Sequence, residues 1–327
     1  MQSQKIPTFE DVSSAAERLA GKAFRTPLIE SVALNKRVGG RVLIKPENLQ
    51  RMGAFKFRGA YNAVSRISKD KWPGGVAACS SGNHASGVAE AARLCGLKAT
   101  IVMPDDAPDI KLNRTRNAGA EIVTYNRQRD NREQIAADIS KELRAHYISP
   151  YDDPHIIAGQ GTSGLELMQQ AQEQGLTPDC LLAPCGGGGL ISGLALAVKH
   201  FNPGIEVYAV EPEGFDDHKR SLSSGTREKN DAASGSICDA LLSPMPGELT
   251  FQINRELLYG AESVSDDEAR DAIRFAFAEL KLVLEPGGAV ALAALLNNRV
   301  ETKGRTIALV LSGGNIDGDR FAEILAS

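Results

Sequence analysis

The sequence lacks the features that mark membrane, disulfide-bonded and nucleotide-binding P-loop proteins. Its longest uninterrupted apolar run, residues 289–296, is far shorter than the ~18 residues of a membrane-spanning helix, which excludes an integral membrane protein. The first residues are polar, so we expect no signal peptide. Five cysteines without C-x-x-C spacing predict neither a disulfide framework nor a thiolate zinc site, and we expect reduced thiols in a cytoplasmic protein.

Charge of one sign is not concentrated anywhere in the chain. The 37 basic and 41 acidic residues are mixed along the sequence and leave a net charge of −4. A nucleic-acid surface would gather lysine and arginine on one face, so we expect no nucleic-acid partner and no membrane partner. With 327 residues, the chain is long enough for two domains and a catalytic cleft between them.

What recurs is a short β-rich run followed by a helical pattern. This alternation is typical of an α/β fold in which open, mostly parallel twisted sheets are flanked by helices. The predicted strands are residues 42–45, 76–79, 100–103, 121–125, 180–183, 206–210 and 306–311.

Two helix starts carry capping signals, and one long segment carries no signal. Thr8 with Asp11, and Ser265 with Glu268, have the spacing of a capping box, and apolar residues continue the second helix to Leu280. Residues 213–258 are rich in Ser, Gly and Asp without a sustained period. Such a segment in a compact chain is usually functional, so we expect a lid, a metal loop or a contact surface there.

A run of four glycines, Gly186–Gly189, separates a predicted strand from a predicted helix. Glycine lets the backbone wrap an anion with its N–H groups at a helix N-terminus, which predicts a phosphate site. A dinucleotide site, with Glu211 at the ribose, is one alternative, but no G-x-G-x-x-G register fits. A P-loop is excluded because no Gly-Lys-Ser/Thr follows the glycines. A tight turn that needs glycine only for packing is the simplest alternative.

A second strand-to-helix junction reads Ser80-Ser-Gly-Asn-His84. Small hydroxyl residues, a glycine and an amide that open a helix make a good site for a carboxylate. Ordinary helix capping is the alternative explanation, with His84 as a packed helix residue.

A third segment places Lys56 between Phe55 and Phe57. Partial desolvation lowers the pKa of a lysine and makes its amine nucleophilic, although a lysine that only extends its amine to the surface gives the same pattern. Together the three segments predict a ligand with a phosphate, a carboxylate and a carbonyl that forms an imine. An amino acid attached to pyridoxal phosphate has all three.

With these motifs the chain resembles the serine racemase and serine/threonine dehydratase family, which are fold-type II pyridoxal phosphate enzymes. The resemblance implies two α/β domains of the kind found in the tryptophan synthase β subunit. The large domain would hold residues 1–76 and 150–327, and the small domain residues 77–149. The matching stretches are residues 53–59, 80–84, 157–162, 186–189, 285–286 and 312–315.

The resemblance also implies a role for each site residue. Lys56 would form an imine with pyridoxal 5'-phosphate and later remove the Cα proton, and Ser81 would lie on the opposite face of the ring. Asn83 would bond the ring 3-oxygen, Phe55 would line the ring and Ser312 would face the pyridine nitrogen. The phosphate would be held by Gly186, Gly187, Gly188, Gly189 and Leu190. The substrate carboxylate would be bound by Ser80, Ser81, Gly82, Asn83 and His84.

Two further sites follow from the racemase branch of this family. Glu211, the Phe215 carbonyl and Asp217 match a site for Mg²⁺, Mn²⁺ or Ca²⁺, since oxygen ligands suit hard cations; a solvated acidic turn is the alternative. Arg132 aligns with an arginine that meets a substrate β-carboxylate, for which a guanidinium is suited; an exposed arginine at a helix start is the alternative.

The implied activity is α,β-elimination from L-threonine, L-serine and similar β-hydroxy amino acids, giving a 2-oxo acid and ammonia. The alternatives are a 3-hydroxyaspartate dehydratase, a serine or aspartate racemase and, more remotely, a non-catalytic ligand-binding protein. Ala240 follows Asp239 where the family usually has glycine, which puts the side-chain specificity in question. The family tends to form homodimers, so we expect one here.

Overall fold

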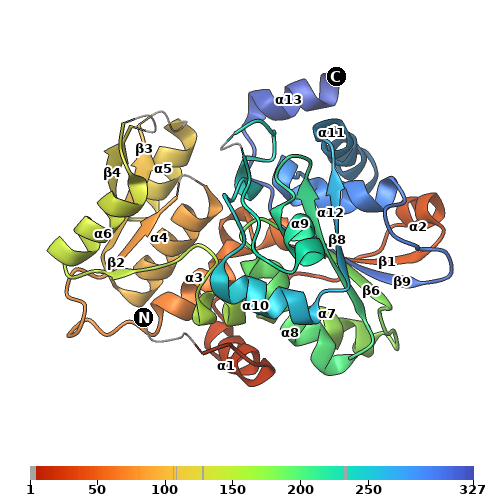
Figure 1. Ribbon diagram of the computed structural model, residues 1–327, viewed down its shortest axis with the longest axis horizontal. Coiled ribbons are helices and arrows are strands. Elements are labelled where there is room, and N and C mark those ends of the chain that lie inside the picture. Colours follow the sequence, from red (N-terminus) through yellow and green to blue (C-terminus); the bar gives the residue numbers. More distant parts are fainter. Residues whose placement is uncertain (1–4, 81, 106, 108, 127–128, 232–233) are drawn as a thin grey trace.

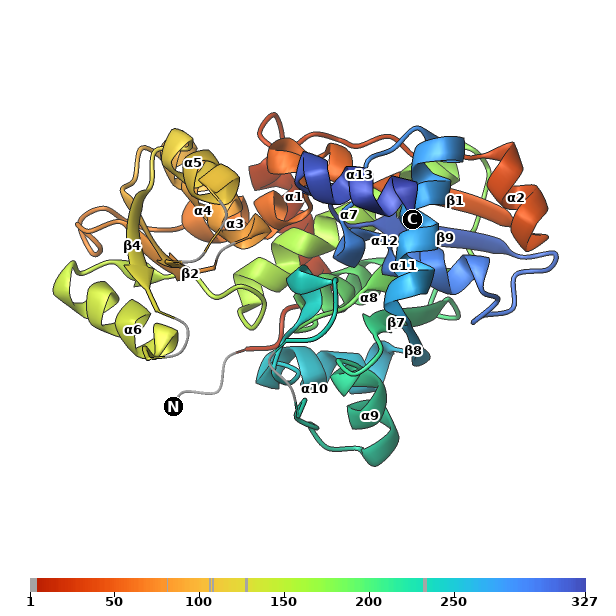
Figure 2. The ribbon, with the colours of Figure 1, turned by 90° about the horizontal axis from the view of Figure 1, so that it is seen from above.

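Two parallel sheets form the centre of the protein (Figures 1 and 2). The computed structural model describes residues 5–327 except 81, 106, 108, 127–128 and 232–233. The larger sheet has the order β1 (Arg41–Pro46), β9 (Thr306–Leu311), β6 (Cys180–Pro184), β7 (Glu206–Pro212) and β8 (Gly260–Val264). The smaller sheet has the order β4 (Glu121–Tyr125), β3 (Ala99–Pro104), β2 (Val76–Cys79) and β5 (His146–Tyr147).

The larger sheet is covered on both faces, which explains its nearly continuous apolar strands. Cys180 and Leu182 of β6 point into a cluster with helix α12 (Pro286–Leu296). Leu181 and Ala183 point to the other face, into a cluster with α7 (Pro154–Glu173) and α8 (Gly189–Phe201). Successive side chains of a strand alternate between its two faces. Since both faces are covered here, every position of this strand is buried. The predicted α/β architecture with parallel sheets flanked by helices is therefore confirmed.

Helices cover both sheets, and those around the smaller sheet are seen on the left of Figure 1. No helix formed by the described residues is long and apolar enough to cross a membrane. The helices are α1 (Phe9–Leu19), α2 (Val32–Val38), α3 (Lys56–Val64), α4 (Asn83–Cys95), α5 (Asp109–Asn117), α6 (Arg132–Glu142), α7 (Pro154–Glu173), α8 (Gly189–Phe201), α9 (Asp217–Ser224), α10 (Glu248–Leu257), α11 (Asp266–Phe275), α12 and α13 (Gly318–Ala326).

Both predicted helix starts are present, and one helix end differs from the prediction. The Thr8 N–H donates to the Asp11 carboxylate, and Ser265 and Glu268 bond each other's backbone N–H groups. The α-helical hydrogen bonding of α11 ends at Phe275, and a π-helical turn, Ala276–Leu280, continues to Lys281. Lys281 has a left-handed backbone with φ of 59°, so the helical period ends there.

A buried network of charges joins the start of α3 to the larger sheet. The Arg58 guanidinium donates to Glu47 and to Glu166, each at 2.7 Å, and Lys45 donates to Glu166 at 2.8 Å. The side chains of Arg58 and Glu47 are fully buried. A buried charge is tolerated only when its partners are present, so this network fixes the turn that leads to Lys56.

We therefore expect Glu47→Gln to lower the free energy of unfolding by about 1.5–3 kcal/mol, the usual cost of losing a hydrogen bond to a charged group. Chemical denaturation measures the change. Glu173→Gln is the matched control, because the Glu173–Arg25 pair is exposed and such pairs contribute at most about 1 kcal/mol. Equal effects of the two substitutions would contradict a stabilising role for the buried network.

Candidate active site

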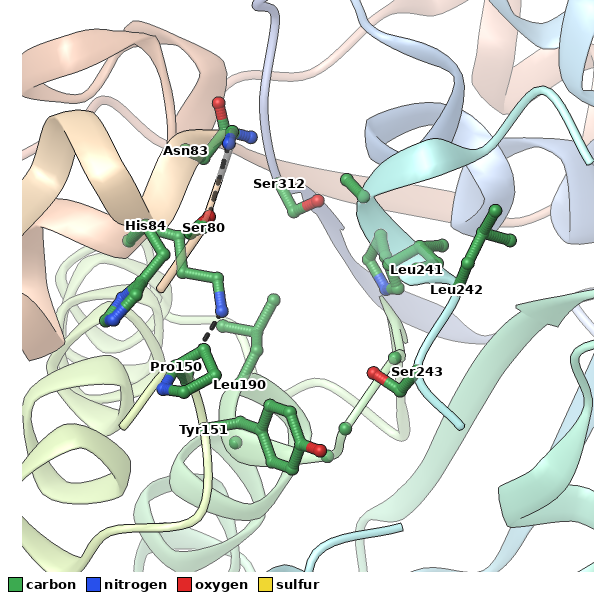
Figure 3. Close-up of a pocket in the computed structure, with 18 of the residues that line it drawn as sticks. Ser80, Asn83, His84, Pro150, Tyr151, Leu190, Leu241, Leu242, Ser243 and Ser312 are labelled. Atoms are coloured by element: carbon green, nitrogen blue, oxygen red, sulfur yellow. Dashed lines mark hydrogen bonds between the residues drawn. The ribbon is translucent and has the colours of Figure 1, made fainter. Parts of the chain in front are cut away.

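A cavity of about 480 Å³ is lined by residues that follow strands of both sheets. Its lining includes residues that follow β2, β5, β6 and β9 at their carboxyl ends, together with Lys56 at the start of α3. In parallel α/β sheets this edge is where ligands bind. Figure 3 shows Ser80, Asn83 and His84 on one side of the cavity and Leu241, Leu242 and Ser243 on the other.

Lys56 extends its amine into this cavity, where Nζ donates to the Pro150 carbonyl at 2.7 Å. Burial lowers the pKa of the Lys56 amine to about 8, and the Glu285 carboxylate acts in the opposite direction. The predicted lowering is thus confirmed, but only one neighbouring ring faces the amine. The centroid of the Phe55 ring lies 5.2 Å from Nζ, whereas Phe57 is buried in the core beside Tyr61.

The glycine run Gly186–Gly189 forms the turn from β6 into α8 and lines the cavity. Gly188 has φ of +94°, a conformation that disfavours other residues, and a Cβ there would lie 2.6 Å from Nε2 of His218. A Cβ on Gly187 would lie 2.4 Å from the Tyr151 ring. Gly187 and Gly188 are therefore required because a side chain at either would clash with Tyr151 or His218. The backbone N–H groups of the turn lie at the N-terminus of α8, a position that suits an anion.

The Ser80–His84 junction leads from β2 into α4 on the opposite wall. The Ser80 hydroxyl accepts from the Gly82 N–H at 3.2 Å. His84 is buried, and burial lowers the pKa of its imidazole to about 3. Nε2 of the neutral ring lies 3.1 Å from the Ile148 carbonyl oxygen. Since a carbonyl only accepts, Nε2 carries the proton. Ser81 lies outside the described residues.

Asn83 is held by two partners distant in sequence. Its Nδ2 donates to Glu285 at 2.6 Å, and its Oδ1 accepts from Asn315 at 2.7 Å. Asn315 also donates to the Met52 carbonyl. Ser312, which follows β9, is buried beside this group and lines the cavity. The amide orientation of Asn83 is thus fixed before any ligand binds.

Four residues that define this site had no role predicted from the sequence. Glu285 and Asn315 stood only in matching motifs, because nothing local reveals their contact with Asn83. The other two are Tyr151, which packs on the glycine run, and Asp152, whose carboxylate accepts from three N–H groups at the start of α10. Their position just after β5 was the available signal, but a strand of two residues is hard to predict.

The proposed ligands of a hard cation lie apart from the cavity. Glu211 is the penultimate residue of β7, and Phe215 and Asp217 follow the strand; all three are buried. Burial and the Glu211 charge raise the pKa of Asp217 to about 7, and its Oδ2 has no hydrogen-bond partner in the described part of the chain. A cation at Asp217 would satisfy this buried oxygen, whereas both Glu211 oxygens already accept backbone N–H groups, from His218 and Lys219.

The specificity residues are placed only in part. The turn Asp239–Leu241 lines the cavity, and Ala240 lies beside the start of α12, 3.3 Å from the Cβ that a side chain at Gly287 would have. Arg132 begins α6, and its side chain lies outside the described residues.

A nucleophilic amine, a glycine turn at a helix N-terminus and a fixed amide around one cavity define an enzyme that uses pyridoxal phosphate. The chain belongs to the family described as pyridoxal-phosphate dependent enzymes, which matches residues 19–313.

Three relatives illustrate the similarity. Serine racemase of Schizosaccharomyces pombe is 40% identical over 98% of both chains. L-threo-3-hydroxyaspartate ammonia-lyase of Saccharomyces cerevisiae is 41% identical over 98% of this chain and 97% of its own. Among solved structures, a threonine deaminase of T.th. is 44% identical, with a TM-score of 0.90, over 95% of this chain and 99% of that chain.

The low pKa of Lys56 gives a testable pH dependence. Only the neutral amine attacks a carbonyl, so the rate at which the cofactor-free protein takes up pyridoxal phosphate should rise with pH through about 8. Glu285→Gln removes the carboxylate that favours the ammonium form and should move this midpoint to lower pH. Stopped-flow absorbance at several pH values measures it.

Glu279→Gln, at an exposed position, is the control and should leave the midpoint unchanged. A midpoint that stays in place or rises in Glu285→Gln would show that this carboxylate does not set the charge of Lys56.

Proposed function

We propose that this protein is a pyridoxal phosphate-dependent dehydratase that converts L-threonine, L-serine and similar β-hydroxy amino acids to 2-oxo acids and ammonia. The observation that carries the proposal is the Lys56 amine, which shares one cavity with the Gly186–Gly189 turn. Two relatives named above are a threonine deaminase and a hydroxyaspartate ammonia-lyase.

The residues of this chain fit the cofactor at each of its polar ends. Gly186–Gly189 and Leu190 would hold the phosphate through backbone N–H groups. Phe55 would lie against the ring and Ser312 at its nitrogen, and the second hydrogen of Asn83 Nδ2 would bond the ring 3-oxygen. When bound, the cofactor supplies an imine linkage and a ring that withdraws electrons from Cα.

The residues of the chain would bind and orient the substrate and move its protons. Ser80, Ser81, Gly82, Asn83 and His84 would hold the substrate carboxylate, which aims the Cα–H bond at Lys56 and supplies proximity. Neutral Lys56 Nζ then takes the Cα proton, which the lowered pKa permits at physiological pH. Ser81 would serve as proton donor on the other face of Cα in a racemase side reaction.

The hard cation, the compartment and the assembly complete the proposal. Glu211, Asp217 and the Phe215 carbonyl would bind Mg²⁺, Mn²⁺ or Ca²⁺. We place the protein in the cytoplasm as a homodimer. Residues 77–149 would be a smaller domain, since the strands described there pair only with one another, and residues 1–76 and 150–327 the larger one.

A 3-hydroxyaspartate ammonia-lyase is the second candidate, favoured by the relative of that name and by Arg132. A serine or aspartate racemase is the third, favoured by the serine racemase relative. The three differ in substrate and product, so one experiment separates them.

The test is product formation by the cofactor-loaded protein on L-serine, L-threonine, D-serine and the four 3-hydroxyaspartate isomers, with and without Mg²⁺. We expect pyruvate from serine and 2-oxobutyrate from threonine. Oxaloacetate alone would favour the second candidate, and Arg132→Ala should then raise KM for hydroxyaspartate. Inversion without 2-oxo acid would favour the racemase, and inactivity on all substrates would refute the substrate class.

A further inference from the structure

A thiol, a carboxylate and an imidazole meet behind the glycine turn. Cys185 is the residue before Gly186, Glu211 is the penultimate residue of β7, and His218 lies in the first turn of α9. All three are at least 99% buried, and Glu211 and His218 are not among the residues that line the cavity. The cofactor chemistry proposed above uses neither Cys185 nor His218.

The donor atoms of these three side chains lie within 4.8 Å of one another. His218 Nδ1 is 3.4 Å from Glu211 Oε1. Two donors bound to one tetrahedral ion at about 2.1 Å lie about 3.4 Å apart, so this pair already has the separation that a shared ion requires.

The His218 ring also lacks the partners that a buried imidazole needs. Neither Nδ1 nor Nε2 has a hydrogen-bond partner in the described part of the chain. An unsatisfied polar group in the interior is costly, and both nitrogens of one ring are affected. An ion at Nδ1 would satisfy one of them and fix the tautomer with the proton on Nε2.

We propose that Cys185, Glu211 and His218 form a site for a divalent transition-metal ion of the Zn²⁺ or Co²⁺ class. Sulfur and imidazole ligands favour such ions, whereas Mg²⁺ and Ca²⁺ take oxygen ligands. The site shares Glu211 with the hard-cation site but replaces the Phe215 carbonyl and Asp217 with a thiolate and an imidazole. On binding, the Cys185 proton passes to solvent as the metal–sulfur bond forms.

The position of the site gives it a structural effect on the phosphate turn. Cys185 is bonded to Gly186, and His218 Nε2 lies 2.6 Å from the position that a Cβ of Gly188 would take. The Cys185 N–H also donates to the Val210 carbonyl at 2.8 Å, one residue before Glu211. An ion would therefore join both ends of the turn to β7 and α9, and the metal-loaded protein should lose its cofactor more slowly.

The test measures binding in the holoenzyme and uses no activity assay, so its failure would leave the proposed lyase function untouched. Chelator-treated holoenzyme is dialysed against Zn²⁺ alone or Mg²⁺ alone, and bound metal is counted by mass spectrometry. We expect one Zn²⁺ per chain, with affinity reduced about tenfold or more in Cys185→Ala and His218→Gln. Mg²⁺ binding should be unchanged in Cys185→Ala and lost in Asp217→Asn.

Cys180→Ala, which removes another buried free thiol, is the control and should keep full Zn²⁺ affinity. X-ray absorption of the Zn²⁺-loaded wild-type protein tests the same site without a substitution, and we expect a sulfur ligand at about 2.3 Å. No retained Zn²⁺, a metal shell without sulfur, or Zn²⁺ affinity unaffected in both Cys185→Ala and His218→Gln would overturn the proposal.

Discussion

Lys56→Ala should abolish 2-oxo acid formation and remove the visible absorbance band of the lysine–cofactor imine. The amine both holds the cofactor and takes the Cα proton in the proposed reaction, and loss of a general base alone costs about 10²–10⁴-fold in rate. We expect a fall of at least about 10³-fold. Product assays and absorbance spectra of the purified variant measure the two effects.

Folding should not be affected, because the Lys56 amine extends into a cavity and its hydrogen bond to the Pro150 carbonyl is a single contact with a loop. Lys22→Ala, at an exposed position, is the control for loss of a lysine as such. Substantial activity in Lys56→Ala, or borohydride trapping of the cofactor on another lysine, would refute the assignment.

Gly188→Ala should release the cofactor while leaving most of the fold intact. The new Cβ would meet His218 at 2.6 Å and the Asn254 amide at 2.9 Å, and the backbone would keep φ of +94°. Such strain costs about 1–3 kcal/mol, and the crowding adds to it. We expect cofactor affinity to fall about 100-fold, measured by titration of the cofactor-free protein with pyridoxal phosphate.

Gly175→Ala provides a matched control. Gly175 has φ of +70° with nothing near its would-be Cβ, so the substitution adds similar backbone strain at a remote position. It should lower stability and leave cofactor affinity unchanged. Equal losses of affinity in both variants would mean that the effect is general destabilisation and not the geometry of the glycine turn.

Burial decides which elements of the fold could be predicted. The strands of the larger sheet that are covered on both faces appear in the sequence as continuous apolar runs, as in residues 307–311 of β9. Strand β8, Gly260–Val264, is an edge strand that is mostly only partly buried, and its mixed composition gave no signal. Strand β5 has two residues, too few for any pattern.

Helix α10, in the segment without a predicted structure, shows a second limit. Its first N–H groups are capped by Asp152, a residue nearly a hundred positions earlier. A cap supplied by a distant residue leaves no mark in the local sequence, whereas Ser265 and Glu268 are neighbours and could be recognised.

The active site likewise combines local motifs, which could be recognised, with contacts between residues distant in sequence, which could not. Lys56, the glycine run and the Ser80–His84 junction are local motifs whose chemistry is evident from residue types. The contacts that hold Asn83 come from Glu285 and Asn315, more than 200 positions away. Only the three-dimensional fold brings these residues together, so their positioning role could not be derived from spacing.

The wall formed by Leu241, Leu242 and Ser243 carries a consequence for how this scaffold diversifies. It belongs to a short 3-10 turn and the connection after it, outside the strands described for either sheet. The lysine and the phosphate turn, by contrast, are built on α3 and on the β6–α8 junction. Leu241 belongs to the buried core, whereas Leu242 and Ser243 do not, so changes at these two residues can reshape the space for a substrate side chain while the reactive centre stays constant.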